Sequence, residues 1–275
     1  MKKSQGKTAQ INELLYQALE TEKGGVKIYE TALRCAVNKD LRKEWTEYLE
    51  QTRTHVKVAT NTLTALGLDP SVDTPGRLVV RHIGEALVQA MDRALQAGDN
   101  VAAELVACEC VLLAETKDHA NWELIGHVAS HSSGTQSEIL KSAHDAVEED
   151  EDHHVYHTKG WCRELWIQSL GFDAVLPPPE EVKQVDTAIA AARAEKSREG
   201  MLRQSSQLAA CAFARRRNRL RIFSDSSATS TGLVMKSSTP FFRPARRASR
   251  LVCAVTMMMG MSAVTEFDFS RCATS

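Results

Sequence analysis

The segment Val147–His157 reads VEEDEDHHVYH and gathers carboxylates and imidazoles in one short run. Glu151 and His154 stand three residues apart, which is about one helical turn, so their side chains leave the same face of a helix. Val147 and Trp161 share the heptad position of His154, so this face is apolar above and below the pair. A buried carboxylate and imidazole need a partner because a bare buried charge is costly. A metal ion is a partner that accepts both kinds of side chain.

The composition around this segment favours helices over strands. Of the 275 residues, 43% are hydrophobic and 5% aromatic, and Ala/Leu/Glu-rich runs dominate positions 9–200. A capping-box pattern, Thr135-x-x-Glu138, precedes the helix that holds the acid–imidazole run. The sequence therefore predicts an all-α fold with helices over residues 10–37, 41–66, 77–96, 101–130, 135–171 and 182–196.

The chain divides by composition into three parts. Residues 1–176 carry the predicted four-helix bundle, including a crossover helix, and residues 177–200 an appended C-terminal helix. Residues 201–275 lack sustained periodicity and hold 12 Lys and Arg against 3 Asp and Glu. This composition predicts a disordered basic tail, with at most weak contacts to nucleic acid or an anionic membrane through clusters such as Arg215–Arg217.

Polar residues interrupt the apolar seam of each long helix at a similar depth. Glu22 lies 16 residues before a turn near residue 38, and His55 lies 17 after it. Glu115 lies 18 residues before a turn near residue 133, and Glu151 and His154 lie 18 and 21 after it. At about 1.5 Å rise per residue, antiparallel helices bring these side chains to within a few Å of one level. His119, one turn after Glu115 on the same stripe, is a further candidate.

These residues resemble the metal-ligand pattern of ferritin-like di-iron carboxylate proteins of the rubrerythrin and bacterioferritin kind. Glu22, followed seven residues later by Tyr29, is similar to the family's first-helix Glu and Tyr, and Glu115 is similar to its third-helix Glu. Glu151 and His154 match the fourth-helix Glu-x-x-His, and the long crossover after the second helix also fits. The resemblance covers about residues 9–172. It implies a ferritin-like bundle with metal ligands at Glu22, His55, Glu115, His119, Glu151 and His154.

The second helix departs from the family pattern. Thr52 stands where the family has the Glu that precedes His55 by three residues, so one bridging carboxylate is missing. The resemblance still implies iron, with manganese or zinc as alternatives. It also implies reaction with O₂ or peroxide of a ferroxidase, peroxidase or oxygenase type. The alternative is a non-catalytic helical scaffold with a degenerate metal site, and Thr52 favours that hypothesis.

The remaining features bear on compartment and assembly. The seven cysteines are scattered without a Cys-x-x-Cys pair, which is typical of free thiols in a reducing compartment. The amino terminus lacks the apolar core of a signal peptide, and the longest apolar run is too short to span a bilayer. We therefore expect a cytoplasmic protein that does not enter a membrane. By analogy with ferritin-like bundles, it is expected to form a homodimer.

Overall fold

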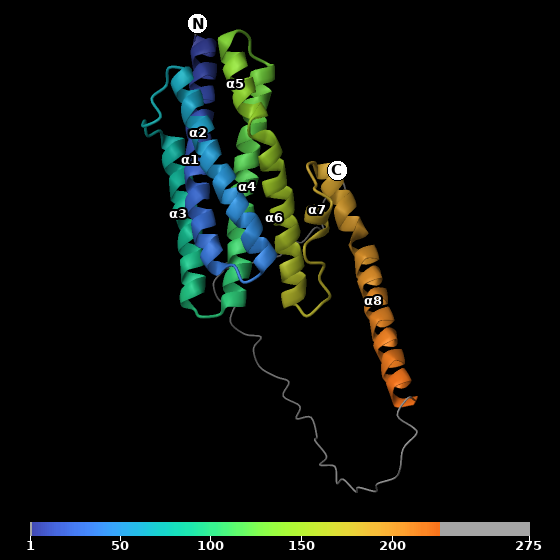
Figure 1. Cartoon of the computed structure of the whole chain (residues 1–275). Coiled ribbons are helices and arrows are strands. Elements are labelled where there is room, and N and C mark those ends of the chain that lie inside the picture. The colour runs from blue at the N-terminus through green and yellow to red at the C-terminus, as the bar shows by residue number, and fades with distance from the viewer. Residues whose placement is uncertain (1, 226–275) are drawn as a thin grey trace, which may run out of the picture. The chain divides into compact units, whose positions relative to one another are not determined.

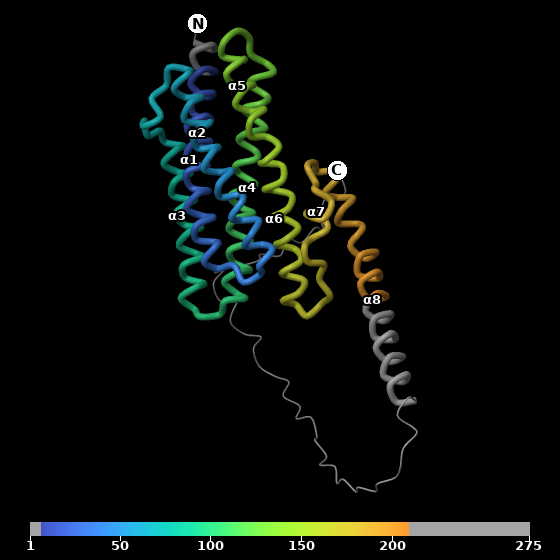
Figure 2. The backbone as a smooth tube through the Cα atoms, viewed as in Figure 1, coloured from blue at the N-terminus to red at the C-terminus, as the bar shows by residue number. Residues whose placement is uncertain are grey.

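A computed structural model describes the backbone of residues 2–225 and the side chains of residues 7–208 (Figures 1 and 2). The described backbone is all-helical, as predicted, and no strand occurs within it. Residues 226–275 of the predicted basic tail lie outside this range. The helices are α1 (Lys2–Cys35), α2 (Lys39–Ala65), α3 (Pro75–Gln96), α4 (Asn100–Ser130), α5 (Thr135–Asp145), α6 (Glu148–Ser169), α7 (Pro179–Val182) and α8 (Ala188–Asp225).

Local sequence signals set several helix ends. The Asn38 side chain accepts hydrogen bonds from the first turn of α2, and Thr74 and Asp99 do the same for α3 and α4. Gly67 follows α2 with a φ of 71°, a conformation that glycine adopts without a steric penalty. The predicted capping box is wrong, because Gly134 is the N-cap of α5 and makes no side-chain bond there.

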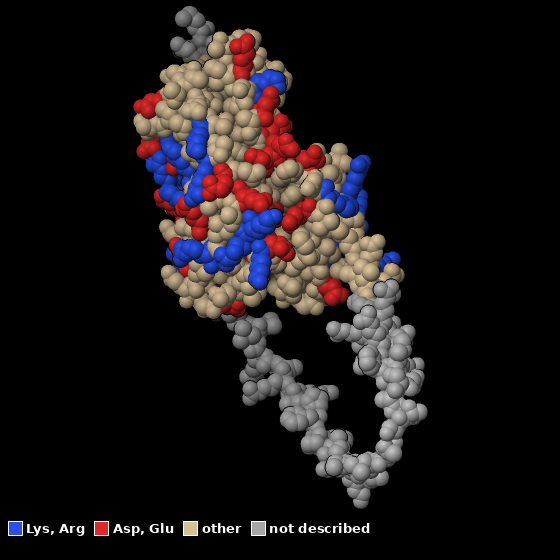
Figure 3. All heavy atoms as spheres, in the orientation of Figure 1, with Lys and Arg blue, Asp and Glu red and all other residues tan. Residues whose placement is uncertain are grey.

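The predicted continuous helix over residues 135–171 is also wrong. It breaks at Ala146 and Val147, and Val147 has a non-helical φ of −129° with a ψ of −31°. Four consecutive acids, Glu148–Glu151, then form the first turn of α6. Carboxylates are stabilised at the positive N-terminal end of a helix dipole, so the break places this acidic run where a helix tolerates it best. Acidic side chains gather at the surface where α5 meets α6 (Figure 3).

The bundle forms around α1, which packs against α2, α3 and α4 (Figure 1). Helix α4 packs in turn against α5 and α6, so α5 and α6 together take the place of the predicted fourth helix. The connection through α3 lies against α1 and α4, as a crossover helix would. Among the described residues, no helix has both the length and the apolar character needed to cross a membrane.

The C-terminal part of the described chain docks on α6. Both oxygens of Glu180 on α7 accept from Arg163, at 2.7 and 2.8 Å, and Arg198 on α8 donates to Glu164. Gly160 faces α7 so closely that an added Cβ would lie 2.6 Å from a Glu180 oxygen. Helix α8 continues to Asp225, well beyond the predicted end at residue 196. One compact unit accordingly extends over residues 1–220.

Candidate metal centre

Buried polar side chains separate two apolar clusters in the bundle. One cluster contains Tyr29, Trp45 and Trp161, and the other contains Leu19, Leu63 and Val147. Between them, each of α1, α2, α4 and α6 contributes polar residues that are almost fully buried: Glu22, His55, Glu115, Glu151 and His154. The structure thus brings together five of the six residues that the sequence proposed as ligands.

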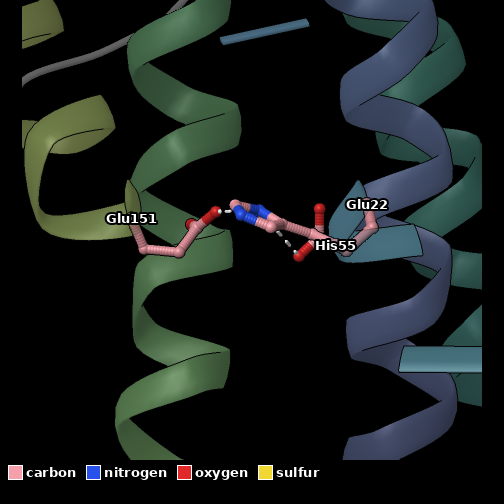
Figure 4. Close-up of side chains that lie close together, drawn as sticks. All are labelled: Glu22, His55 and Glu151. Carbon is pink, nitrogen blue, oxygen red and sulfur yellow. Dashed lines mark ion pairs between the residues drawn. The ribbon is translucent and has the colours of Figure 1, made fainter. Parts of the chain in front are cut away.

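The first group joins α1, α2 and α6 (Figure 4). The Nδ1 atom of His55 lies 3.0 Å from Oε1 of Glu151 and 3.7 Å from Oε1 of Glu22. The imidazole stands between the two carboxylates, and one ligand atom from each residue lies within 4.8 Å of the others. The second Glu22 oxygen has no partner, while Oε1 accepts from the indole of Trp122 at 2.7 Å.

The second group joins α4 and α6 and shares Glu151 with the first. The Nδ1 atom of His154 lies 3.4 Å from Oε2 of Glu115 and 3.6 Å from Oε1 of Glu151. Again, one ligand atom from each residue lies within 4.8 Å of the others. Because Glu151 belongs to both groups, its carboxylate is placed where it could bridge two neighbouring cations.

The outer nitrogen of each imidazole is held by an oxygen acceptor. His55 Nε2 lies 3.1 Å from Oδ2 of Asp150, and His154 Nε2 lies 3.0 Å from Oε1 of Gln51. The Gln51 amide nitrogen donates to Asp150 at 2.8 Å, which fixes its oxygen toward His154. Both Nε2 atoms therefore carry the proton. Such outer-shell acceptors are typical of metal-binding histidines, because they orient the ring and leave the other nitrogen free.

The inner atoms of the cluster lack hydrogen-bond partners. These buried atoms are Glu22 Oε2, His55 Nδ1, Glu115 Oε2, Glu151 Oε2 and His154 Nδ1. With Nε2 protonated, a neutral imidazole would turn the Nδ1 lone pair toward carboxylate oxygens, which is repulsive. Unpaired buried polar atoms also cost free energy comparable to a lost hydrogen bond. The arrangement therefore needs a cation between the rings and the carboxylates, either a metal ion or protons on the imidazoles.

In the metal-free cluster, protons fill this role. Burial alone would lower the pKa of His154, but the Glu115 and Glu151 carboxylates, 3.4 and 3.6 Å from its Nδ1, outweigh this effect and raise the pKa to about 10. Burial alone would raise the pKa of Glu151, yet His154 and His55 hold it at about 2. The pKa of Glu22 is raised well above its usual range by burial and by nearby Asp118 and Glu151. The site attracts positive charge, and a metal ion would have to displace protons.

Asp118 is a fourth buried carboxylate that sequence reasoning missed. It lies on α4 one turn after Glu115, and its Oδ1 is buried without a partner. Burial raises the pKa of Asp118 well above its usual range, and the Glu151 and Glu115 charges add to this effect. Its spacing of three residues from Glu115 is a signal for the same helix face, but His119 has the spacing of four residues and is the predicted ligand.

His119 lies to the side of the cluster and belongs to neither group. Its side chain is 16% exposed, and its Nε2 contacts Oδ1 of Asp152 at 2.8 Å. The ring stands edge-on to Tyr156, 5.8 Å between centroids. His119 lines a cavity of about 200 Å³ whose wall also includes Glu151. The structure thus places this predicted ligand on a path toward the centre.

Thr52 occupies the position where the family resemblance expects a carboxylate. It is buried, and its hydroxyl donates to the backbone oxygen of Tyr48 at 2.8 Å. Its methyl group lies against Gly25 of α1, where an added Cβ would be 3.1 Å away. A glutamate at this position would need space that the close α1–α2 contact fills. Helix α2 thus lacks one carboxylate relative to the family pattern, and Asp118 on α4 supplies one additional carboxylate.

The fold and the centre together define an all-α bundle protein with buried Glu and His groups that could bind a metal. Comparison of the chain with protein-family models, curated proteins and solved structures gives no match. The proposal that follows therefore stands on the residues of this chain.

Proposed function

We propose that this protein binds two transition-metal ions in the bundle, one at Glu22–His55–Glu151 and one at Glu115–Glu151–His154. The observation that carries the proposal is the pair of imidazoles whose Nε2 atoms are held by acceptors while both Nδ1 atoms are turned toward the carboxylates of Glu22, Glu115 and Glu151. In each group, one imidazole nitrogen and one oxygen from each of two carboxylates lie within 4.8 Å of one another, which suits an ion placed between them.

Iron is the first candidate, with manganese or zinc as alternatives. A mixed set of carboxylates and imidazoles suits all three ions. Bound iron or manganese would supply electrons to O₂ or peroxide, the reaction that the ferritin-like resemblance implies. The chain's own part is to hold the ions, to neutralise their charge with Glu22, Glu115, Glu151 and Asp118, and to keep bulk water out of a nearly closed site.

A route for small molecules supports this proposal. The cavity of about 200 Å³ beside His119 has Glu151 in its wall, so it connects a partly exposed surface with the shared carboxylate. Its volume suits O₂ or peroxide better than a large organic substrate, since ligand pockets for drug-sized molecules measure roughly 300–1,000 Å³. His119 and Asp152, which are hydrogen-bonded, line this route and can exchange a proton with a molecule that enters.

The competing hypothesis is a helical scaffold without metal chemistry. Thr52 favours it, because the second helix lacks its expected carboxylate. In that case, the imidazoles would remain protonated and the cluster would be a set of buried ion pairs. Buried pairs of this kind are weak contributors to stability, since desolvation offsets most of their attraction.

Metal content distinguishes the two hypotheses. The full chain is stripped with EDTA, incubated with Fe²⁺ without oxygen, desalted and analysed for iron by mass spectrometry. We expect about two iron atoms per chain in the wild type and a loss of iron in Glu151→Gln. Glu149→Gln is the matched control, because Glu149 is an exposed acid on the same turn of α6. Wild-type protein that retains no metal after separate incubations with micromolar iron, manganese or zinc would establish the scaffold instead.

A further inference from the structure

A second polar site lies beside the candidate metal centre, in a cavity of about 530 Å³ between α2, α6 and the segment around α7. His157, Glu44 and Tyr48 form its inner wall, and Glu181 is contributed from α7. The centre as described uses none of these four residues as a ligand. Their hydrogen bonds determine what the cavity can recognise.

Each oxygen of Glu44 accepts a hydrogen bond from a neighbouring side chain. The Tyr48 hydroxyl donates to its Oε1 at 2.6 Å, and the indole of Trp161 donates to its Oε2. Because the single phenol proton goes to Glu44, the contact of 3.1 Å between the Tyr48 oxygen and His157 Nδ1 must be donated by the imidazole. His157 therefore carries its proton on Nδ1 and presents a lone pair at Nε2.

That lone pair has no partner. The His157 side chain is 9% exposed, and its Nε2 is buried without a hydrogen bond. Oε2 of Glu181 is likewise buried and unpaired. Burial, together with the charge of Glu44 and a hydrogen bond to it, raises the pKa of Glu181 to about 8, so the group is largely neutral near pH 7. With its proton shared with Glu44, Oε2 is an acceptor as well.

The free atoms of the cavity are thus acceptors, and its rim is acidic. Asp40 and Glu47 line the opening, opposed by Lys43 alone among the lining lysines and arginines. These residues do not form a compact metal site, because neither three-residue group with ligand atoms within 4.8 Å includes them. A ligand that fits must bring several N–H donors and positive charge, which describes a primary ammonium group.

We propose that this cavity binds a small organic molecule through a primary ammonium group, with His157 Nε2 and Glu181 Oε2 as acceptors. Only one layer of side chains separates the cavity from the centre. The Tyr48 ring lies 4.1 Å from the His154 ring between centroids, and Gln51 lines the cavity while holding His154 Nε2. A role for the cavity as a substrate pocket rests on the proposed metal function. Binding of an ammonium group to the cavity does not depend on that function.

The test uses calorimetric titration of the full-length, metal-free chain with n-butylammonium chloride, and with n-butanol and sodium butyrate as neutral and anionic analogues. We expect saturable binding of the ammonium only. His157→Phe, which removes the acceptor and keeps the ring, should weaken binding about tenfold, as expected for loss of a hydrogen bond to a charged donor. Lys43→Met, an exposed change at the rim, should strengthen binding several-fold, and circular dichroism checks that both variants remain helical.

Several results would overturn the proposal. One is a lack of saturation by about 10 mM n-butylammonium, a concentration at which even a site with a millimolar dissociation constant would be mostly filled. Equal binding of n-butanol, or binding unchanged by His157→Phe, would also refute it, as would His157-dependent binding of Mn²⁺ in place of the ammonium. Repeating the titration with Glu151→Gln separates the two proposals, because this variant should lose iron but keep ammonium binding.

Discussion

Glu151→Gln should destabilise the metal-free protein in a pH-dependent way. Glu151 is 2% exposed and contacts both imidazoles, which hold its pKa at about 2 against an ordinary 4.5 even though burial acts in the opposite direction. At about 1.4 kcal/mol per pH unit, this difference corresponds to roughly 3 kcal/mol. Glutamine keeps the shape of glutamate but not its charge. The variant should therefore lose roughly 3 kcal/mol of its free energy of unfolding at pH 7, in line with the cost of breaking a buried pair.

The sign of the pH dependence follows from the lowered pKa. A carboxylate with a depressed folded-state pKa stabilises the protein above its unfolded-state pKa, near 4.5, and that contribution disappears as the pH falls toward 2. The stability difference between wild type and Glu151→Gln should therefore be constant from pH 8 to pH 5 and shrink below that range.

Urea unfolding in EDTA, followed by circular dichroism across this pH range, measures the difference directly. Glu149→Gln controls for loss of an acid from the same helix turn, and it should change the free energy of unfolding by less than about 0.5 kcal/mol. A Glu151→Gln protein as stable as the wild type at pH 7 would refute the reasoning. It would mean that repulsion among the buried carboxylates cancels the pairing with the imidazoles.

Three further predictions concern residues around the centre and the bundle. Asp150→Asn should lower metal affinity about 10- to 100-fold in competition with a chelating dye, because it weakens the acceptor that orients an imidazole ligand; unchanged affinity would argue against that role. Gly160→Ala should lower the melting temperature, since the added Cβ would lie 2.6 Å from Glu180 of α7 and overpacking costs about 1–3 kcal/mol. Gly200→Ala is the control and should leave the melting temperature unchanged, because an added Cβ there meets nothing within 4 Å. Arg77→Met should lower the free energy of unfolding in urea by about 3–5 kcal/mol at pH 7, because Glu20 stays buried with one guanidinium partner fewer. This loss of stability should diminish below about pH 4.5, where Glu20 becomes protonated.

Much of the fold could be read from local patterns. The helical period, the caps at Asn38 and Asp99 and the glycine after α2 at Gly67 are short-range signals, because each depends on residues that lie in or next to the helix concerned. The break before α6 could not be predicted from these patterns. The apolar heptad spacing continues through Val147 from the helix before the break to the helix after it. Apolar spacing alone does not predict a helix break that leaves the heptad register of the flanking helices unchanged.

The candidate centre shows the same division. Counting residues from each turn was enough to bring Glu22, His55, Glu115, Glu151 and His154 to one level, because the rise of a helix is fixed and the turns are short. Whether these residues bind metal remains a prediction.

Sequence could not decide between Asp118 and His119. Residues three and four places after Glu115 are both near its face, since a helical turn of 3.6 residues lies between them. The packing of α1 and α6 against α4 buries Asp118 and leaves His119 at the edge.

The sequence by itself thus determined the helices and the depth at which acids and imidazoles meet, since both depend on distances along one chain. Only the tertiary structure decided how the imidazole rings of His55 and His154 are oriented. It alone also forms the second cavity, beside His157. The acceptors Asp150 and Gln51 reach their histidines from neighbouring helices, and Glu181 reaches the cavity because Arg163 anchors α7. These contacts join residues that no periodic pattern relates, so only the folded chain specifies them.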